Sequence, residues 1–257
     1  MVTSVTGSSD TFGTDTFGLN VSRGLVGGVS GLNKFGRNID VAGATHEVVW
    51  DGHATALTFP TVAAQLTIQS SGDDDSAGTA AQSITIQGVD ANWDMQTETI
   101  DLDATSDATS VGSYLRVFRA FVASVGSATE WNDNDIDILS GANLLARISA
   151  TMGQTLMAVY SVPANKSLYI EDYYFSLLRT TGSTAVAAEV DMHTRDSVTG
   201  VTLLKHTLGG LNTGGTPFPF EFTPPFKVSE KTDVWIDASS SAAADISAGF
   251  NGYLVND

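Results

Sequence analysis

The sequence predicts an all-β protein with two tandem antiparallel β-sandwich or jelly-roll-like domains behind an extended N-terminal arm. Many short segments alternate apolar and polar residues, and Gly, Pro, Asn, Asp or Ser separates one segment from the next. No amphipathic pattern of about 12 residues or more is sustained, so helices of ordinary length are not expected. The length of 257 residues suits one large β domain or two of about 100 residues each.

Residues 1–40 form the predicted arm. They are rich in Gly, Ser, Thr and Asn, contain the tandem DTFGT–DTFGL, and sustain neither a helical nor a strand period. The apolar residues spaced along this segment are too many for a simple spacer, so we expect the arm to bind a neighbouring subunit or partner. A flexible tail or a self-packed loop is the alternative. The expected contact residues are Phe12, Phe17, Leu25, Leu32 and Phe35.

The first domain is expected over residues 41–150. Its predicted strands are HEVVWDG, AQLTIQSSG, AQSITIQGVD, TETIDLDA and YLRVFRAFVASV. Ile84 and Ile86 before the turn DANWD match Ile100 and Leu102 after it, which predicts a hairpin with matching apolar faces. The segment YLRVFRAFVASV is largely apolar on both faces, as is typical of a strand inside a sheet.

The second domain is expected over residues 151–257, with a soft boundary near residue 150. Its strand-like segments run from QTLMAVYSVP to ISAGFNGYLVND. In the segment FPFEFTPPFKVSE the prolines favour a sheet edge or a loop. The phenylalanines of the same segment are expected in the core, with subunit contact as the alternative.

Charge and composition exclude several classes of protein. The formal net charge is −17 with only 12 Lys and Arg residues, so nucleic acid and anionic membrane surfaces are not expected partners. No apolar run of about 18 residues is present, and the N-terminus shows no secretory signal. Cysteine is absent, which excludes disulfides, thiolate metal sites and catalysis by a thiol.

Two acidic segments raise the question of a cation site. SSGDDDSAG (residues 70–78) and NDNDIDI offer the carboxylates that Ca²⁺ prefers, but solvated loops are the favoured interpretation. NDNDIDI begins like an EF-hand loop and lacks its Gly and Glu, so only an irregular calcium site stays open. The histidines lie far apart in the sequence and form no metal-binding motif, so we expect no metal and no cofactor. They are His46, His53, His193 and His206.

No catalytic motif is present. The chain contains no GxSxG, P-loop or dinucleotide-binding signature, and the Gly-rich GLVGGVSGLNKFG lacks the GK[ST] of a P-loop. We therefore expect no enzyme and no catalytic residues. If the protein binds a glycan, Trp93 and Trp131 are the expected contacts, because an indole ring offers a flat apolar face and a polar edge.

At GLNKFGRNIDV (residues 31–41) the chain resembles a group of virion structural proteins of tailed, often marine, bacteriophages. Those proteins show an NKFGRN-x-D signature, a hairpin similar to GVDANWDMQTETIDL and a strand similar to YLRVFRAF. Their ends are similar to KVSEKTDVWIDASSSAAADISAGFNGYLVND. The resemblance spans about residues 30–257, leaves the DTFG tandem outside, and carries over no catalytic residue.

The resemblance implies a virion component. Among virion roles we expect a capsid decoration, or cement, protein that binds the outer capsid surface and stabilises the shell by bridging capsomers. An acidic protein suits the outside of a DNA-filled shell. The expected partners are the major capsid protein and further copies of the chain in a homotrimer. After synthesis in the host cytoplasm, the expected location is the outer capsid surface. The alternative is a head-fibre or tail-associated protein that binds host glycan.

Overall fold

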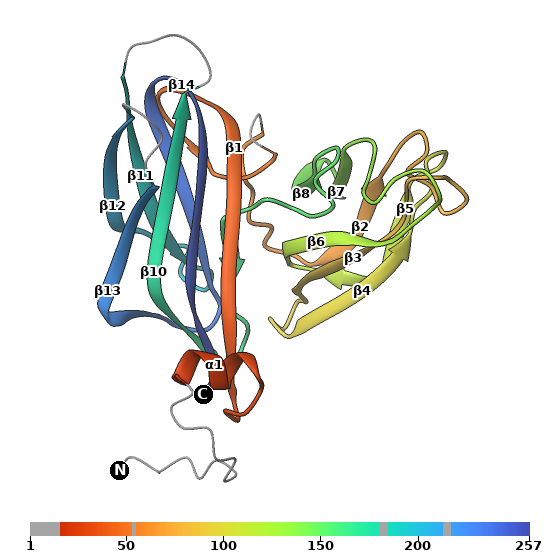
Figure 1. The fold of residues 1–257 in the computed structure, drawn as a ribbon. Helices are drawn as coiled ribbons and strands as arrows, with labels where there is room; N and C mark the ends of the chain where they lie inside the picture. Colours follow the sequence, from red (N-terminus) through yellow and green to blue (C-terminus); the bar gives the residue numbers. More distant parts are fainter. Residues whose placement is uncertain (1–15, 53–54, 180–184, 213–216) are drawn as a thin grey trace.

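The computed structural model describes residues 16–52, 55–179, 185–212 and 217–257, and it confirms the all-β fold (Figure 1). Within these ranges the one helix is the short α1 (Phe17–Ser22), and no helix there is long and apolar enough to cross a membrane. The strands form two modules that lie side by side. The larger module contains β1 (Val29–Val48), β9 (Val159–Ser161), β10 (Lys166–Arg179), β11 (Val186–Asp196), β12 (Thr202–Asn212), β13 (Pro217–Val228) and β14 (Thr232–Asn256). The smaller module contains β2 (Ala64–Gln69), β3 (Ala81–Val89), β4 (Met95–Asp101), β5 (Ala108–Tyr114), β6 (Arg116–Val125), β7 (Ile136–Ser140) and β8 (Asn143–Ile148).

The long strand β14 organises the larger module. Up to Ser240 it pairs with β11, and from Ala244 onward it pairs with β10. On its other side β1 runs antiparallel to it, and β9 adds a short pairing near its start. The resulting order, β12-β11-β14-β10-β13, is compatible with a sandwich in which β14 passes from one layer to the other.

The smaller module consists of two sheets with the orders β5-β2-β7-β8 and β4-β3-β6. Leu66, Ile84 and Ile136 belong to one apolar core between them. Trp50, which follows β1, and Trp235 of β14 belong to the same core. Apolar packing therefore continues from the smaller module into the larger one, and the junction between them is part of the protein interior.

The two modules differ from the predicted domains of residues 41–150 and 151–257. The smaller module is inserted between β1 and β9, so the larger module is built from residues 29–48 together with 159–256. The expected boundary near residue 150 coincides with the end of the smaller module, because β8 ends at Ile148. Residues 29–40, expected in the extended arm, are part of β1 and pair with β14 of the same chain.

The sequence did not indicate a strand over residues 29–40 because the buried positions there are not apolar. Lys34, Gly36 and Asn38 are buried and alternate with more exposed residues. A Cβ atom on Gly36 would lie 2.2 Å from the carbonyl oxygen of Val49 and 2.3 Å from the backbone nitrogen of Ala158. Only glycine fits where β1 passes the segments that enter and leave the smaller module.

The hairpin predicted in GVDANWDMQTETIDL is confirmed. β3 and β4 pair in a register that places Ile84 opposite Ile100. Asp90 organises the turn, because its Oδ1 accepts hydrogen bonds from the backbone N–H groups of Asn92 at 2.8 Å and Asp94 at 3.0 Å. Asp90 therefore acts as a turn former, as expected for an Asx turn.

The phenylalanine-rich strand β13 lies at an edge and packs its rings inward, as expected. It pairs with β10, and no other described strand pairs with it. Its rings are partly buried against the core of the larger module: Phe218, Phe220, Phe222 and Phe226. Its prolines offer no N–H to a further strand, so this edge is poorly suited to strand addition.

Candidate functional site

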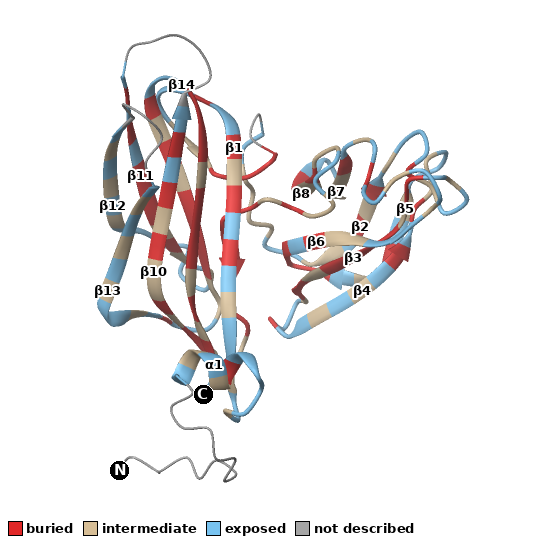
Figure 2. Cartoon of the chain, viewed as in Figure 1, coloured by how far each residue is buried: buried red, intermediate tan, exposed pale blue. Residues whose placement is uncertain are grey.

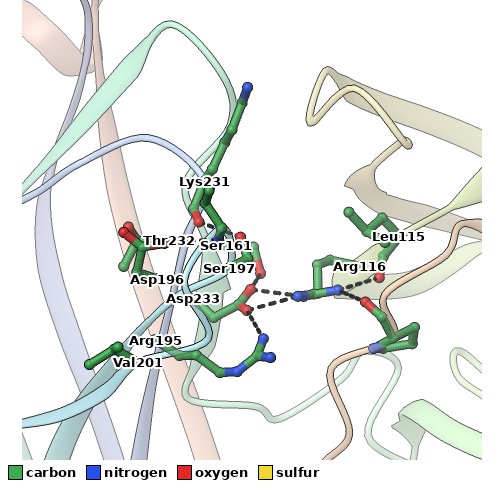
Figure 3. Close-up of polar contacts among 12 residues, drawn as sticks. Leu115, Arg116, Ser161, Arg195, Asp196, Ser197, Val201, Lys231, Thr232 and Asp233 are labelled. Atoms are coloured by element: carbon green, nitrogen blue, oxygen red, sulfur yellow. Dashed lines mark hydrogen bonds and ion pairs between the residues drawn. The ribbon is translucent and has the colours of Figure 1, made fainter.

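A buried ion pair joins the two modules (Figure 3). Arg116 of β6 points its Nε and Nη2 atoms at the two carboxylate oxygens of Asp233, at 2.8 and 2.9 Å. The Ser161 hydroxyl donates to the same carboxylate at 2.7 Å, and Nη1 of Arg195 lies 3.6 Å from it. Since Arg116 and Asp233 are both buried and satisfied within the protein, the pair holds the modules in one orientation.

Trp93, expected as a glycan contact, belongs to this junction. Its ring centroid lies 5.2 Å from Cζ of Arg116, and the ring of Phe59 covers the same guanidinium at 5.3 Å. Only 7% of Trp93 is exposed, so its ring is not presented to a sugar. Trp131, the second expected glycan contact, is 45% exposed and lies on a loop before β7.

The segment NKFGRN of β1 has a structural explanation. The ammonium of Lys34 donates to the carbonyl oxygen of Phe118 in β6, across the junction. Nε of Arg37 lies 3.0 Å from both carboxylate oxygens of Asp245 in β14. Asn38 donates to the carbonyl oxygen of Val48 at 3.2 Å. The signature therefore ties β1 to β14 and to the smaller module.

Two ionisable groups at the junction have strongly shifted pKa values. Burial, together with the nearby Arg119, lowers the pKa of Lys34 to about 7. Burial raises the pKa of Asp51 to about 7. Oδ2 of Asp51 accepts a hydrogen bond from the Ser149 N–H at 3.3 Å, while its Oδ1 is buried without a partner. These groups titrate near neutral pH because the junction excludes water.

Three strands of the larger module bring histidines and aspartates together, and we call His46, Asp191, His193 and Asp237 the His–Asp cluster. Nδ1 of His46 lies 2.9 Å from Oδ1 of Asp237 and 3.5 Å from Oδ2 of Asp191. Nε2 of His193 lies 3.2 Å from Oδ2 of Asp237 and 4.0 Å from Oδ2 of Asp191. Nε2 of His46 also lies 3.5 Å from a carboxylate oxygen of Glu189.

The register between paired strands brings the residues of the His–Asp cluster together. Asp191 lies directly opposite Asp237 in the β11–β14 pair, and Val48 lies opposite Asp237 on the other side. Residues two apart in a strand share a face, so His193 projects beside Asp191. Trp235 supports both partners: its ring stacks on His193 with centroids 5.1 Å apart, and its Nε1 lies 3.3 Å from Oδ2 of Asp237.

The carboxylates of the cluster are mostly buried. The hydrogen bond that His193 donates to Asp237 raises the pKa of His193. Burial alone would raise the pKa of Asp237, but the hydrogen bonds from His193 and His46 outweigh burial and lower that pKa. The side chain of Asp191 is 10% exposed, and its Oδ1 is buried with no hydrogen-bond partner among the described residues. The cluster thus keeps an unsatisfied buried acceptor beside two imidazoles.

The cluster was not predicted from the sequence because its histidines are far apart in the chain. His46 and His193 meet only through the sheet, by way of β14. A weaker signal was present in EVDMH, where Glu189, Asp191 and His193 occupy alternate positions and so share one face of a strand. Metal-ligating residue types at alternate positions of a predicted strand are the sequence signal that indicates such a cluster.

The acidic segments that left a calcium site open are satisfied by the protein itself. Asp74 is buried and accepts hydrogen bonds from the backbone N–H groups of Ala81 at 3.1 Å and Asp133 at 3.0 Å. Nε of Arg147 lies 2.6 Å from Oδ1 of Asp137. These contacts explain the two segments as loops fixed by hydrogen bonds and ion pairs.

The predicted arm contacts lie in different surroundings. Phe12 lies outside the described residues. The exposed ring of Phe17 packs edge-on against Tyr253, with centroids 5.0 Å apart. Leu32 is partly buried against the core of its own chain. Leu25 and Phe35 are exposed, as is Phe17. The described part of the chain therefore leaves apolar surface of these three side chains uncovered.

The outer edge of β12 is an exposed apolar surface. β12 pairs with β11, and no other described strand pairs with its second edge. Every described side chain of β12 is exposed or half-buried, in agreement with the pale strand in Figure 2. About half of each large apolar side chain along this edge is exposed: Val201, Leu203, Leu204 and Leu211. We call these four residues the β12 surface.

Comparison with known proteins adds little to these observations. No family model matches the chain, and no curated protein matches it. Among solved structures, a chain from the structure of infectious bursal disease virus Gt strain is 11% identical, with 88% of this chain and 71% of that chain covered. The TM-score of 0.22 is too low for this similarity to carry an argument about fold or function.

Proposed function

We propose that this protein is a bacteriophage virion structural protein that decorates the outer capsid surface and stabilises the shell by bridging capsomers. The observation that carries the proposal is the β12 surface, where exposed leucines coincide with a strand edge that no other described strand pairs with. Such an edge is a ready surface for another protein chain. Shell stabilisation by burial of apolar surface needs this kind of contact and no catalytic group.

Charge and sequence resemblance support the same proposal. A net charge of −17 disfavours contact with packaged DNA and suits the outer face of the shell. The resemblance to virion structural proteins of tailed phages covers about residues 30–257. Assembly as a homotrimer is part of the proposal, because closed symmetry removes free strand edges from solvent.

The test is sedimentation of the protein with bare capsids of the phage that encodes it. The double variant Leu203→Asp and Leu211→Asp places charge on the β12 surface, and we expect capsid affinity to fall about 10-fold or more. The matched control is Val111→Asp on β5 of the smaller module, which is also exposed and should bind as wild type does. Equal binding by the double variant and the control, or no binding by wild type, would refute the proposal.

Copy number provides an independent test. Gel densitometry of purified virions gives the ratio of this protein to the major capsid protein. A shell decoration protein is expected at hundreds of copies per particle, whereas a tail or fibre protein is expected at roughly six to a few dozen. The lower range would overturn the capsid position and favour a tail or fibre role, in which the exposed Trp131 becomes the residue to test for glycan binding.

A further inference from the structure

We propose that the His–Asp cluster is a binding site for a divalent transition metal ion of the Zn²⁺ class. This inference does not depend on the proposed function. The ligand set consists of the imidazole of His46 and the carboxylates of Asp191 and Asp237, with solvent completing the coordination. Imidazole and carboxylate together suit zinc-like ions, whereas Ca²⁺ and Mg²⁺ take oxygen ligands.

The distances within the cluster match such a site. In a tetrahedral site with metal–ligand bonds of about 2.0–2.1 Å, neighbouring ligand atoms lie about 3.3–3.4 Å apart. The two contacts of His46 Nδ1, at 2.9 Å from Oδ1 of Asp237 and 3.5 Å from Oδ2 of Asp191, bracket that spacing. Ligand atoms of His46, Asp191 and Asp237 all lie within 4.8 Å of one another.

The buried Asp191 carboxylate is the second observation. Its Oδ1 has no hydrogen-bond partner in the described part of the chain, although the side chain is nine-tenths buried. In that same part, the ion pairs of Glu189, Asp191 and Asp237 are made with histidines, and no Lys or Arg pairs with these carboxylates. A bound cation would offset this excess of buried negative charge.

The surroundings of the site support metal binding as well. His193 and Trp235 both contact Oδ2 of Asp237, as outer-shell groups do around metal ligands, and the ring of Trp235 stacks on His193. The ligands come from β1, β11 and β14, which the sheet holds rigidly. The side chain of His46 is 29% exposed, so an ion can reach the cluster from solvent.

The experiment uses full-length protein treated with a chelator and then titrated with ZnCl₂ by isothermal calorimetry. Metal content after gel filtration is measured by mass spectrometry. We expect about one tightly bound zinc ion per chain, a thermal midpoint that rises with zinc concentration, and no displacement by equal Ca²⁺. Co²⁺ substitution should give the visible absorption of a four-coordinate ion.

The variants His46→Gln and Asp237→Asn should each weaken zinc binding about 100-fold or more, since even outer-shell changes cost roughly 10–100-fold. Trp235→Phe keeps the stacking ring and loses the indole N–H, so a loss of roughly 10-fold is expected. Asp94→Asn removes an equal charge from an exposed turn of the smaller module and should bind as wild type does. Circular dichroism verifies the fold of each variant.

Two results would overturn the proposal without any variant. Wild-type protein that binds no zinc, or that binds Ca²⁺ in preference to zinc, shows that the cluster is a hydrogen-bonded network only. A zinc affinity that Asp94→Asn and Asp237→Asn reduce equally shows diffuse attraction to an acidic protein.

Discussion

At the scale of single residues, the junction between the modules is defined by ionisable groups that are buried. Burial lowers the pKa of Lys34 and raises the pKa of Asp51, and each reaches about 7. Both groups lose hydration on burial and gain a hydrogen bond within the protein. Lys34 donates to a carbonyl oxygen of β6, and Asp51 accepts from the N–H of Ser149. Groups of this kind make stability depend on pH.

Replacing Asp51 by Asn tests this dependence. The pKa of Asp51 is raised in the folded state, so the folded protein holds the proton more tightly, and stability falls as pH rises from about 4 to about 7. Asn carries no charge and avoids that loss. We expect Asp51→Asn to gain stability relative to wild type by roughly 1–3 kcal/mol more at pH 8 than at pH 5.

Urea denaturation at the two pH values measures this difference. The exposed Asp94→Asn is the control, and it should leave the pH dependence of wild type unchanged. The groups facing Asp51 are Arg147 and Lys34, and the attraction of the Arg147 guanidinium limits the effect. An equal change in stability at both pH values would show that Asp51 is ionised without cost in the folded protein.

At the scale of elements, β1 is placed by close backbone contact. Gly36 lies against the backbone atoms of Val49 and Ala158, which cannot move aside as side chains can. Gly31 lies in the same strand, and a Cβ there would meet no atom within 4 Å. The two glycines therefore form a matched pair that differs in packing.

Gly36→Ala is expected to lower the free energy of unfolding by about 2–4 kcal/mol, because the new methyl group overpacks against backbone. Gly31→Ala should change it by no more than about 0.5 kcal/mol. Chemical denaturation of both variants gives the comparison. Similar values for the two would mean that β1 does not pass the connecting segments as closely as the structure places it.

At the scale of the whole molecule, the Arg116–Asp233 pair couples the modules. Removing one partner of a buried pair costs about 3–5 kcal/mol, because the remaining charge is left without compensation. We expect Arg116→Met to lose this amount. Arg147→Met breaks the half-exposed pair with Asp137 inside the smaller module and should lose only about 1 kcal/mol or less. Calorimetric melting tests both, and equal losses would contradict a special role for the junction.

The insertion of the smaller module makes a second prediction at this scale. A fragment of residues 151–257 lacks β1, which pairs along β14 from Val29 to Val48, so we expect it to melt without cooperativity. Trp50 and Met157 face each other across a β-bridge, so a short linker can join residues 29–50 to 157–257. This joined chain should melt cooperatively. A cooperative melt of the 151–257 fragment alone would show that β1 is dispensable.

The sequence by itself determined the all-β class, the hairpin at DANWD and the inward phenylalanines of β13, because strand alternation and turn residues are local signals. Polar and glycine residues at the buried positions of β1 gave no such signal, so residues 29–40 were expected in an arm.

Only the tertiary structure decided how distant segments meet. The pairing of β1 with β14 inserts the smaller module, and it brings His46 beside Asp237. The burial of Trp93 under Arg116 likewise depends on contacts across the junction. These features rest on the register between strands far apart in the chain. Because the energy that fixes a register is the packing of whole faces, no short stretch of sequence contains it.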